Sequence, residues 1–374
     1  MSDDDTPRTG PFSDPLKTWP NDDLMLKEEF RDALREENEA LFNVLDWPEL
    51  REKFERHDKP AGRGKKISHM QGLAAIGLAG IGIILIGAIP ALPHDLERDL
   101  SIVALGAMGL GGLLGLVHWL VLRSRSTWLG NRFWTERLRQ LYFQSLVGNL
   151  ELTAQAMTDP DSLEELKKYR AKWLREFYVD PQDPRDRIRE IVLDRAESGI
   201  WLRPEWREHH VLHNPPAAIH VLLDALHRQR IEIQHYYAGK NLGPDVYSPG
   251  TRAKILRSIG QLCTVLVVIA AAIGGISYGY EIRIMCGNGL TWAAVAAVLS
   301  AVGLTARAAD EGLQNETDAD RYEWYKEAID ELKERYEHDR SVGPRMQELR
   351  RMEEITYQEL RRFLRTHGGA RFLM

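Results

Sequence analysis

The sequence predicts an all-α integral membrane protein, with two transmembrane helical hairpins and helical cytoplasmic extensions. Three observations predict this class: four long apolar runs that contain no Asp, Glu, Lys or Arg, their arrangement in two closely spaced pairs, and the near absence of strand patterns. A bilayer core of about 30 Å needs about 20 apolar helical residues to cross it. The alternative is that these runs are buried core hairpins of a soluble protein. It is disfavoured because a soluble core would have to bury four long charge-free helices. The runs cover residues 70–92, 102–122, 259–280 and 286–306.

Charges beside the runs predict how the hairpins are oriented. Basic residues precede and follow each pair, whereas the loops inside the pairs, 93–99 and 281–284, carry no positive excess. Positive charge stays on the cytoplasmic side of a membrane. We therefore expect a multi-pass protein of the cell inner membrane, with both termini cytoplasmic and two short loops outside. The flanking basic residues are Arg63, Lys65, Lys66, Arg123, Arg125, Arg132, Arg137, Arg139, Arg252, Lys254, Arg257 and Arg307.

The hairpins divide the rest of the chain. The first 20 residues are rich in Asp, Pro, Thr and Ser, which predicts a disordered terminus. The segments that follow are a cytoplasmic helical segment, the first hairpin, a cytoplasmic helical region, the second hairpin and the C-terminal helices. Their predicted bounds are 1–20, 21–69, 70–122, 123–254, 255–306 and 307–374.

Helical periodicity and breakers predict the cytoplasmic elements. Asn21, Asp22 and Asp23 are interpreted as the cap of a helix that runs to Leu45. Acidic residues such as Asp23, Glu28 and Glu36 are interpreted as solvated helix faces. Further helices are expected over 128–157, 187–197, 215–240, 308–340 and 344–366, the last two separated at Gly343-Pro344.

Composition limits the classes of function. The net charge of −6 argues against general nucleic-acid binding, so the expected surroundings are the lipid bilayer and other proteins. The two cysteines, Cys263 and Cys286, form neither a metal spacing nor a disulfide framework.

Small residues recur at four-residue steps on three of the runs. Lipid tails are as apolar as leucine, so membrane helices associate through close packing at such residues. The packing can lie within one subunit or between subunits, and we expect a homo-oligomer. The repeats are Ala107, Gly111 and Gly115; Ala271, Gly275 and Gly279; and Ala293, Ala297 and Ala301.

The polar residues within the runs are few, and they are candidates for a pore lining or for helix interfaces. The four candidates are His118, Gln261, Thr264 and Ser300. No run contains a carboxylate or a basic residue, which argues against a proton-coupled pump. A pore of this kind would be weakly selective and gated by apolar contacts.

Histidines are the main candidates for an enzyme or metal site. Glu208, His209, His210 and His213 could place side chains on one helix face, but Pro215-Pro216 breaks the stretch immediately afterwards. No zinc-protease, nucleophile-elbow, phosphate-loop or dinucleotide motif is present. The sequence therefore predicts no enzyme, no metal and no cofactor.

Motifs around both hairpins resemble a known family. The segment from Arg230 through Gln234 to Tyr237 resembles the R-I-x-x-Q-x-x-Y signature that precedes the hairpin of SLATT proteins, the SMODS- and SLOG-associating two-transmembrane effectors. The series Trp128, Arg132, Glu136 and Arg139 is similar to the pattern that follows a SLATT hairpin, and 321–325 and 352–359 look like the post-hairpin helices. The resemblance covers about two thirds of the chain.

The resemblance implies an oligomeric membrane effector of a bacterial conflict or antiviral defence system. Such an effector is pore-forming or membrane-disrupting and is controlled by a separate nucleotide-signalling or sensor protein. Neither a nucleotidyltransferase nor a SLOG sensor is recognisable in this sequence. The alternative is a non-conducting membrane scaffold that anchors a cytoplasmic partner.

Five residues are candidates for coupling the cytoplasmic helices to the spans. Arg230, Gln234 and Tyr237 share one helix face at i, i+4 and i+7. Arg132 and Glu136, at i and i+4, can pair or cross to that face. The alternative is that these residues only satisfy one another and hold the helices together.

Overall fold

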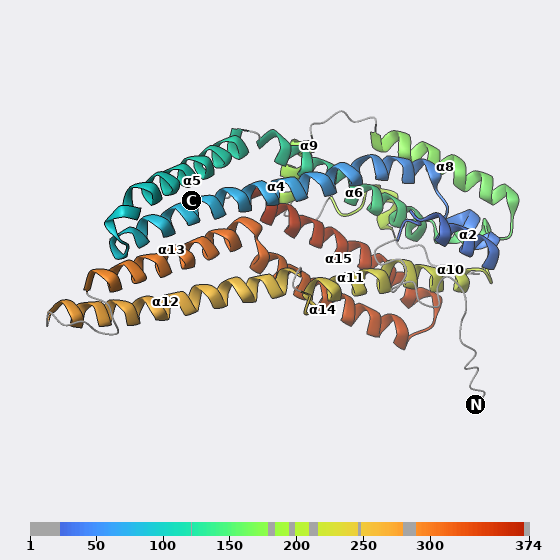
Figure 1. Ribbon diagram of the computed structural model, residues 1–374. Coiled ribbons are helices and arrows are strands. Elements are labelled where there is room, and N and C mark those ends of the chain that lie inside the picture. The colour runs from blue at the N-terminus through green and yellow to red at the C-terminus, as the bar shows by residue number, and fades with distance from the viewer. Residues whose placement is uncertain are drawn as a thin grey trace. The chain divides into compact units, whose positions relative to one another are not determined.

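The computed structural model is helical, and no strand occurs among the residues it describes (Figure 1). Those residues are 23–120, 122–178, 184–193, 199–208, 216–245, 248–279 and 289–369. They form two units, with boundaries that fall within helices α4, α6, α11, α14 and α15. The core unit is the described part of Met1–Ala61, Leu129–Asn241 and Asp320–Arg365. The hairpin unit is the described part of Gly62–Trp128, Leu242–Ala319 and Thr366–Met374.

The hairpin unit contains four helices that are long and apolar enough to cross a membrane. They are α4 (Pro48–Ala88), which continues into the 3₁₀ turn η1 (Ile89–Ala91), α5 (His94–Leu120), α12 (Pro249–Gly279) and α13 (Gly289–Leu313). The predicted all-helical class with two hairpins is confirmed. Three of the helices begin before the predicted runs, because α4, α5 and α12 continue through the charged flanks that bound the apolar pattern.

Close approaches of glycine show how these helices pack. A Cβ on Gly82 of α4 would lie 2.8 Å from the Ala104 carbonyl oxygen of α5, and one on Gly87 would lie 3.3 Å from Ala297 Cβ of α13. A Cβ on Gly80, about two turns before Gly87, would meet the side chain of Thr305 on α13. Helices α4 and α13 are therefore antiparallel neighbours, so the turn after α4 and the beginning of α13 lie at the same end of the unit (Figure 1).

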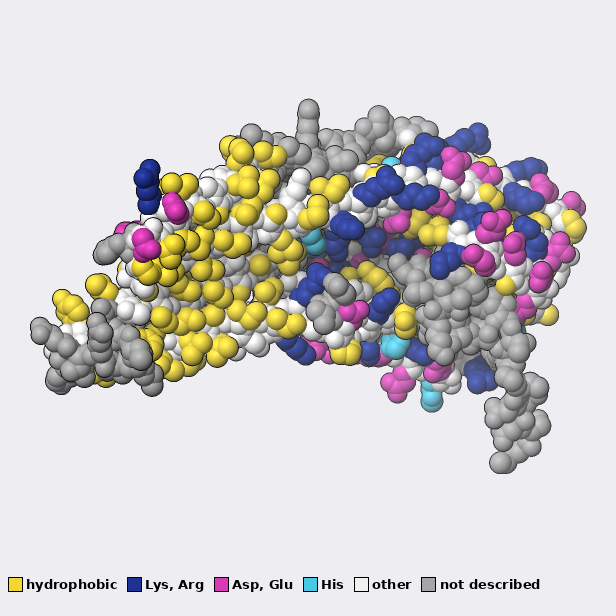
Figure 2. Space-filling view, in the orientation of Figure 1, with side chains coloured by type: hydrophobic (Ala, Val, Ile, Leu, Met, Phe, Trp, Pro, Cys, Tyr) yellow, Lys and Arg dark blue, Asp and Glu magenta, His cyan; other side chains and the backbone are white. Residues whose placement is uncertain are grey.

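Small side chains fill the interior of the hairpin unit, and large apolar side chains cover its outside. The outward side chains include Leu105 and Val268, each 64% exposed. In the space-filling view, hydrophobic side chains cover the visible face of this unit (Figure 2). The buried residues are mainly Ala75, Ala104, Ala270, Ala294 and Ala301, with Gly72, Gly80, Gly82, Gly111 and Gly274.

The core unit has an interior of large residues. Phe54, Phe143 and Trp206 are almost fully buried there, and burying one such side chain stabilises a fold by about 1.5–3 kcal/mol. Its elements are α2 (Glu28–Glu37), α3 (Glu39–Leu45), the first turns of α4, α6 (Leu122–Gly148), α7 (Leu150–Gln155), α8 (Pro160–Tyr178), α9 (Pro184–Leu193), η2 (Pro204–Arg207), α10 (Ile219–Leu226), η3 (His227–Glu232), α11 (Ile233–Leu242), α14 (Asn315–His338) and α15 (Val342–Gly369).

The predicted N-terminal helix to Leu45 is wrong in its cap and in its continuity. Helix α2 begins at Glu28, and the side chain of its N-cap residue Lys27 makes no capping hydrogen bond. The chain breaks at Asn38, whose side chain accepts a hydrogen bond from Leu41 N at 2.9 Å and so caps α3. Asp23 is buried in the core, where Arg139 and Gln234 donate hydrogen bonds to it. Asn21 and Asp22 lie outside the described residues.

The two predicted C-terminal helices correspond to α14 and α15, and the chain breaks between them at residues 339–341, just before Gly343-Pro344. The chain turns at Gln314, which has a φ of 58°, between α13 and α14. Gly343-Pro344 itself lies in the first turn of α15, where proline is tolerated because its missing N–H has no helical partner to bond. Of the other predicted helices, 128–157 divides at Asn149 into α6 and α7. The regions 187–197 and 215–240 correspond to α9 and to α10–η3–α11, apart from residues 194–197 and 215, which lie outside the description.

Candidate functional site: a buried ion network

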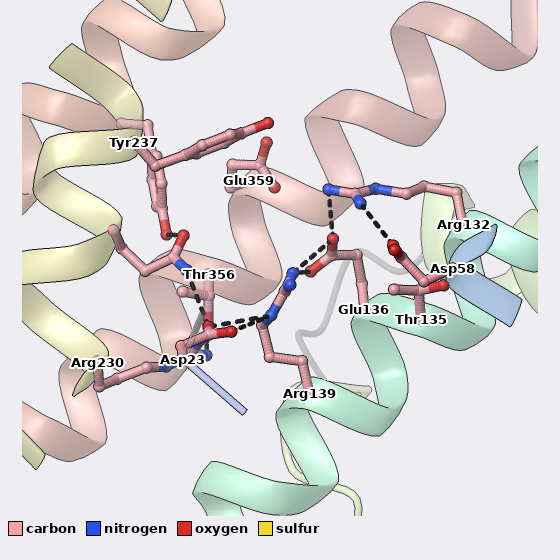
Figure 3. Close-up of polar contacts among 12 residues, drawn as sticks. Asp23, Asp58, Arg132, Thr135, Glu136, Arg139, Arg230, Tyr237, Thr356 and Glu359 are labelled. Carbon is pink, nitrogen blue, oxygen red and sulfur yellow. Dashed lines mark hydrogen bonds and ion pairs between the residues drawn. The ribbon is translucent and has the colours of Figure 1, made fainter. Parts of the chain in front are cut away.

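Arg230 and Gln234, two of the predicted coupling residues, converge on Asp23 inside the core unit (Figure 3). Asp23 is 1% exposed and lies in the segment that precedes α2. It accepts hydrogen bonds from Gln234 Nε2 at 3.0 Å and from Arg139 Nε at 3.1 Å, and Arg230 Nη1 lies 3.7 Å away. Its interpretation as a solvated acidic residue is therefore wrong, because these partners reach it from α6, η3 and α11.

Three charged residues on α6 extend the network. Arg132 Nη2 lies 2.5 Å from Glu136 Oε1. Arg139 Nη1 donates to both oxygens of Glu136, at 2.8 and 2.7 Å. The spacing of three and four residues places these side chains on one face. Arg132 and Glu136 therefore connect to the Arg230–Gln234 face through Arg139 and Asp23, and not by direct contact.

Helix α15 supplies the second partner of Arg230. Arg230 Nε donates to Glu353 Oε1 at 2.8 Å, and Arg230 Nη2 donates to Thr356 Oγ1 at 2.9 Å. The guanidinium also stacks over the Phe143 ring, with its central carbon 4.3 Å from the ring centre. Arg230 thus joins η3, α6 and α15 in one buried cluster.

Tyrosines from α14 complete the network. The Tyr325 hydroxyl donates to Gln234 Oε1 at 3.2 Å. The Tyr237 and Tyr322 hydroxyls lie 3.1 Å apart, and their rings meet edge to face. Each of the three residues on the predicted face therefore has a defined partner: Arg230 with α15, Gln234 with Asp23 and α14, and Tyr237 with α14.

Arginines and carboxylates pair throughout the cluster. Arg132, Arg139 and Arg230 face Asp23, Glu136 and Glu353, and Arg132 also lies 4.0 Å from the half-buried Asp58 (Figure 3). Burial would raise the pKa of Glu136, but Arg132 and Arg139 outweigh it and lower that pKa to about 2. For Asp23 and Glu353, burial outweighs the arginines and the pKa is raised. Glu136 is therefore the most firmly ionised carboxylate of the three.

A π-helical turn carries Arg230. The turn η3 spans His227–Glu232, between the α-helices α10 and α11. Such a turn inserts one residue into a helix and is frequent at functional sites. Gln229 beside Arg230 is 1% exposed, and neither its amide nitrogen nor its amide oxygen has a hydrogen-bond partner among the described residues. The turn therefore contains a buried amide that lacks a hydrogen-bond partner among the described residues, whereas most buried polar groups in proteins are hydrogen-bonded.

Sequence reasoning missed Asp23, Glu353 and Tyr325 as members of this site. Asp23 stands in a run of polar residues with no local signal for burial. Glu353 and Tyr325 lie in the stretches that resemble post-hairpin helices, and only their contacts distinguish them from neighbouring acids and tyrosines.

The small-residue repeats of the hairpin unit differ in their surroundings. Gly111 is buried, and a Cβ there would lie 2.8 Å from the backbone nitrogen of Ala79. Ala301 is also buried, whereas Ala107 and Gly115 are half-buried, and Ala293 and Ala297 are exposed. Ala271, Gly275 and Gly279 are exposed, and no atom lies within 4 Å of a Cβ added at either glycine. The α12 repeat thus faces outward from the described hairpin unit.

Three of the four polar candidates of the spans, Gln261, Thr264 and Ser300, line adjoining cavities between α12 and α13. The side chain of His118 lies outside the described set. The Thr264 hydroxyl donates to Gly260 O at 2.9 Å, and the Ser300 hydroxyl donates to Ala296 O at 2.8 Å. Both hydroxyls are thus bonded within their own helices, and Gln261 is exposed near the basic end of α12.

The histidine-rich region shows no metal site where it is described. His209, His210 and His213 lie outside the description, and the described residues contain no group of three His, Cys, Asp or Glu side chains placed to hold a metal. His235 lies 2.6 Å from Asp330. His227 stacks on Tyr336 at 4.7 Å, and burial lowers its pKa to about 4. His227 is therefore neutral at pH 7.

No protein-family model, curated protein or solved structure matches this chain. The inference of function therefore depends on two features of this chain, the ion network of the core unit and the outward faces of the hairpin unit.

Proposed function

We propose that this chain is a multi-pass protein of the bacterial inner membrane that assembles into a homo-oligomer and acts as a pore-forming or membrane-disrupting effector in a conflict or defence system. A separate nucleotide-sensing partner controls it. Both termini and the core unit lie on the cytoplasmic side. The resemblance of the Arg230–Tyr237 segment and of the post-hairpin helices to SLATT effectors supports this role.

The charges of the hairpin unit support the orientation. The α4–α5 turn and the start of α13 lie at one end, and Asp95 and Glu97 occupy the first turn of α5 there. Arg252, Lys254 and Arg257 lie in the opposite part of α12. Positive residues are retained in the cytoplasm, so this basic end is the cytoplasmic one.

The outward repeat on α12 is the observation that carries the proposal. Ala271, Gly275 and Gly279 present a smooth, exposed strip that no described residue covers at the two glycines. Small residues allow membrane helices to approach closely. A second copy of the chain can therefore pack here, and several copies can assemble through their second hairpins.

One observation favours the second candidate, a non-conducting scaffold. Thr264 and Ser300 direct their hydroxyl hydrogens to backbone carbonyls of their own helices. These hydroxyls are less available to coordinate a permeating ion than free hydroxyls would be. An aqueous path needs polar groups or water along its wall.

Reconstitution separates the two candidates. The full chain is placed in vesicles that contain a self-quenching dye, and its oligomeric size is measured by chemical cross-linking. The effector predicts an oligomer with dye release, and Gly275→Leu should abolish both. Gly109→Leu is the matched control, because Gly109 on α5 is also open to its surroundings. An oligomer that releases no dye would support the scaffold instead.

A further inference from the structure

A groove with a charged mouth runs between α12 and α13 in the hairpin unit. It consists of two adjoining cavities of about 370 and 330 Å³ that share Gly260, Thr264 and Arg307. One lies among charged residues near the beginning of α12, and the other continues along the apolar part of the two helices. The groove therefore combines a polar end with an apolar channel.

The apolar part of the groove runs along the helices to about the depth of one leaflet. Gly260 leaves space where a side chain would stand, because no atom lies within 4 Å of a Cβ added there, and Gly303, Val267, Leu299 and Leu304 line the apolar walls. The Thr264 and Ser300 hydroxyls on these walls are bonded to their own helices. From Arg257 to Val267 the helix rises about 15 Å at 1.5 Å per residue, which is about half of a 30 Å bilayer core. The groove thus matches one leaflet.

The charges at the mouth leave one cation and one anion free. Arg257 pairs with Glu316, and Asp310 accepts a hydrogen bond from Asn315 Nδ2 at 3.3 Å. The side chains of Arg307 and Glu311 are exposed and have neither an ion pair nor a hydrogen bond in the described part of the chain. A guanidinium binds phosphate through parallel hydrogen bonds, and a carboxylate binds an ammonium group.

We propose that this groove binds a glycerophospholipid of the adjacent leaflet whose headgroup carries a phosphate and a primary ammonium, as in phosphatidylethanolamine. Arg307 binds the phosphate, Glu311 accepts from the ammonium, and one acyl chain lies in the channel. Two basic and three acidic side chains at the mouth disfavour a headgroup with net negative charge. A choline headgroup cannot donate hydrogen bonds to Glu311. The proposal depends on the membrane-spanning fold and not on the effector role.

Lipid titration of the purified full chain tests this site. Delipidated protein in mild detergent is titrated with phosphatidylethanolamine, phosphatidylglycerol or phosphatidylcholine of identical acyl chains, and bound lipid is counted by native mass spectrometry. Phosphatidylethanolamine should bind at least about tenfold more tightly than the other two, a difference of about 1.4 kcal/mol. Equal binding of all three, or tighter binding of phosphatidylglycerol, would overturn the proposal.

Variants assign the binding to the groove. Gly260→Leu fills the channel without meeting any described atom within 4 Å of its Cβ, so the fold should persist while lipid binding falls at least about tenfold. Gly109→Leu, open but outside the groove, should bind as the wild type does. Glu311→Gln should bring phosphatidylethanolamine and phosphatidylcholine to similar affinity, and Arg307→Gln should weaken both. Retained lipid preference in Gly260→Leu, with a change of oligomer size, would show that the groove is a contact between copies and contradict the proposal.

Discussion

The two units of this chain pack by opposite rules. The core unit buries its large residues, such as Phe143 and Trp206, together with a cluster of charges. The hairpin unit buries alanine and glycine and exposes leucine, valine and isoleucine. Water drives large apolar groups inward, whereas lipid does not, so close backbone contact decides which residues are inside a membrane bundle. The difference indicates that the core unit is packed as a protein in water is, and the hairpin unit as a helix bundle in lipid is.

The units also differ in how they place polar groups. The core unit gathers carboxylates and guanidinium groups from the N-terminal segment, α6, η3 and α15 around Asp23, Glu136 and Arg230. In the hairpin unit, the described Thr264, Ser300 and Thr305 hydroxyls bond within their own helices. Tertiary polar contacts therefore hold the core unit together, while the spans satisfy these hydroxyls locally. Two tertiary polar contacts of the hairpin unit, Arg257–Glu316 and His367–Asp318, lie outside the apolar runs.

Removal of Arg230 should produce the largest effect. Arg230→Ala leaves Glu353 buried and without its arginine, so unfolding in detergent should become easier by about 3–5 kcal/mol. Arg56→Ala, at the exposed Arg56–Glu52 pair, should cost only about 0–1 kcal/mol. A loss of similar size in both variants would show that the buried network is no stronger than a surface pair.

The same position distinguishes coupling from simple support. Arg230→Ala and Gln234→Ala are expressed and compared for growth arrest and for melting temperature. If the network couples the core unit to the spans, growth arrest should change by more than the loss of stability explains. Activity that follows stability in both variants would assign these residues to holding the helices together.

Acid should weaken the network through Glu136. Its folded pKa is about 2 and its ordinary value is 4.5, so its contribution is present above pH 4.5 and is lost as the pH falls toward 2. The stability difference between the wild type and Glu136→Gln should be on the order of 3 kcal/mol at pH 6 and should shrink over that range. Chemical unfolding at a series of pH values measures it, and a difference that does not vary with pH would contradict the expectation.

Two glycines should separate the inner and outer faces of the spans. Gly111→Leu forces a side chain against the backbone of α4 and should cost about 1–3 kcal/mol in folding stability. Gly275→Leu meets no described atom and should leave the melting temperature of the isolated subunit unchanged. Melting curves and size-exclusion chromatography measure both, and a large loss of folding stability in Gly275→Leu would place that face inside the subunit.

The smallest effect is expected at Thr264. Thr264→Val removes a hydroxyl that bonds only to its own helix, so stability should change by less than about 0.5 kcal/mol. Dye release from vesicles should also be unchanged. A marked change in release would show that this hydroxyl lines a conducting path and that the spans have a polar interior.

The helical class and both hairpins could be predicted from sequence, because a charge-free run of about 20 residues leaves few alternatives to a spanning helix. The face shared by Arg230, Gln234 and Tyr237 was likewise open to prediction, because residues at i, i+4 and i+7 neighbour one another on any helix. Only the tertiary structure revealed Asp23 and Glu353 as partners of that face, the π-turn that carries Arg230, and the pairing of α4 with α13. Local periodicity records which side of a helix is apolar or charged, but contacts between residues more than 100 positions apart depend on how the helices meet.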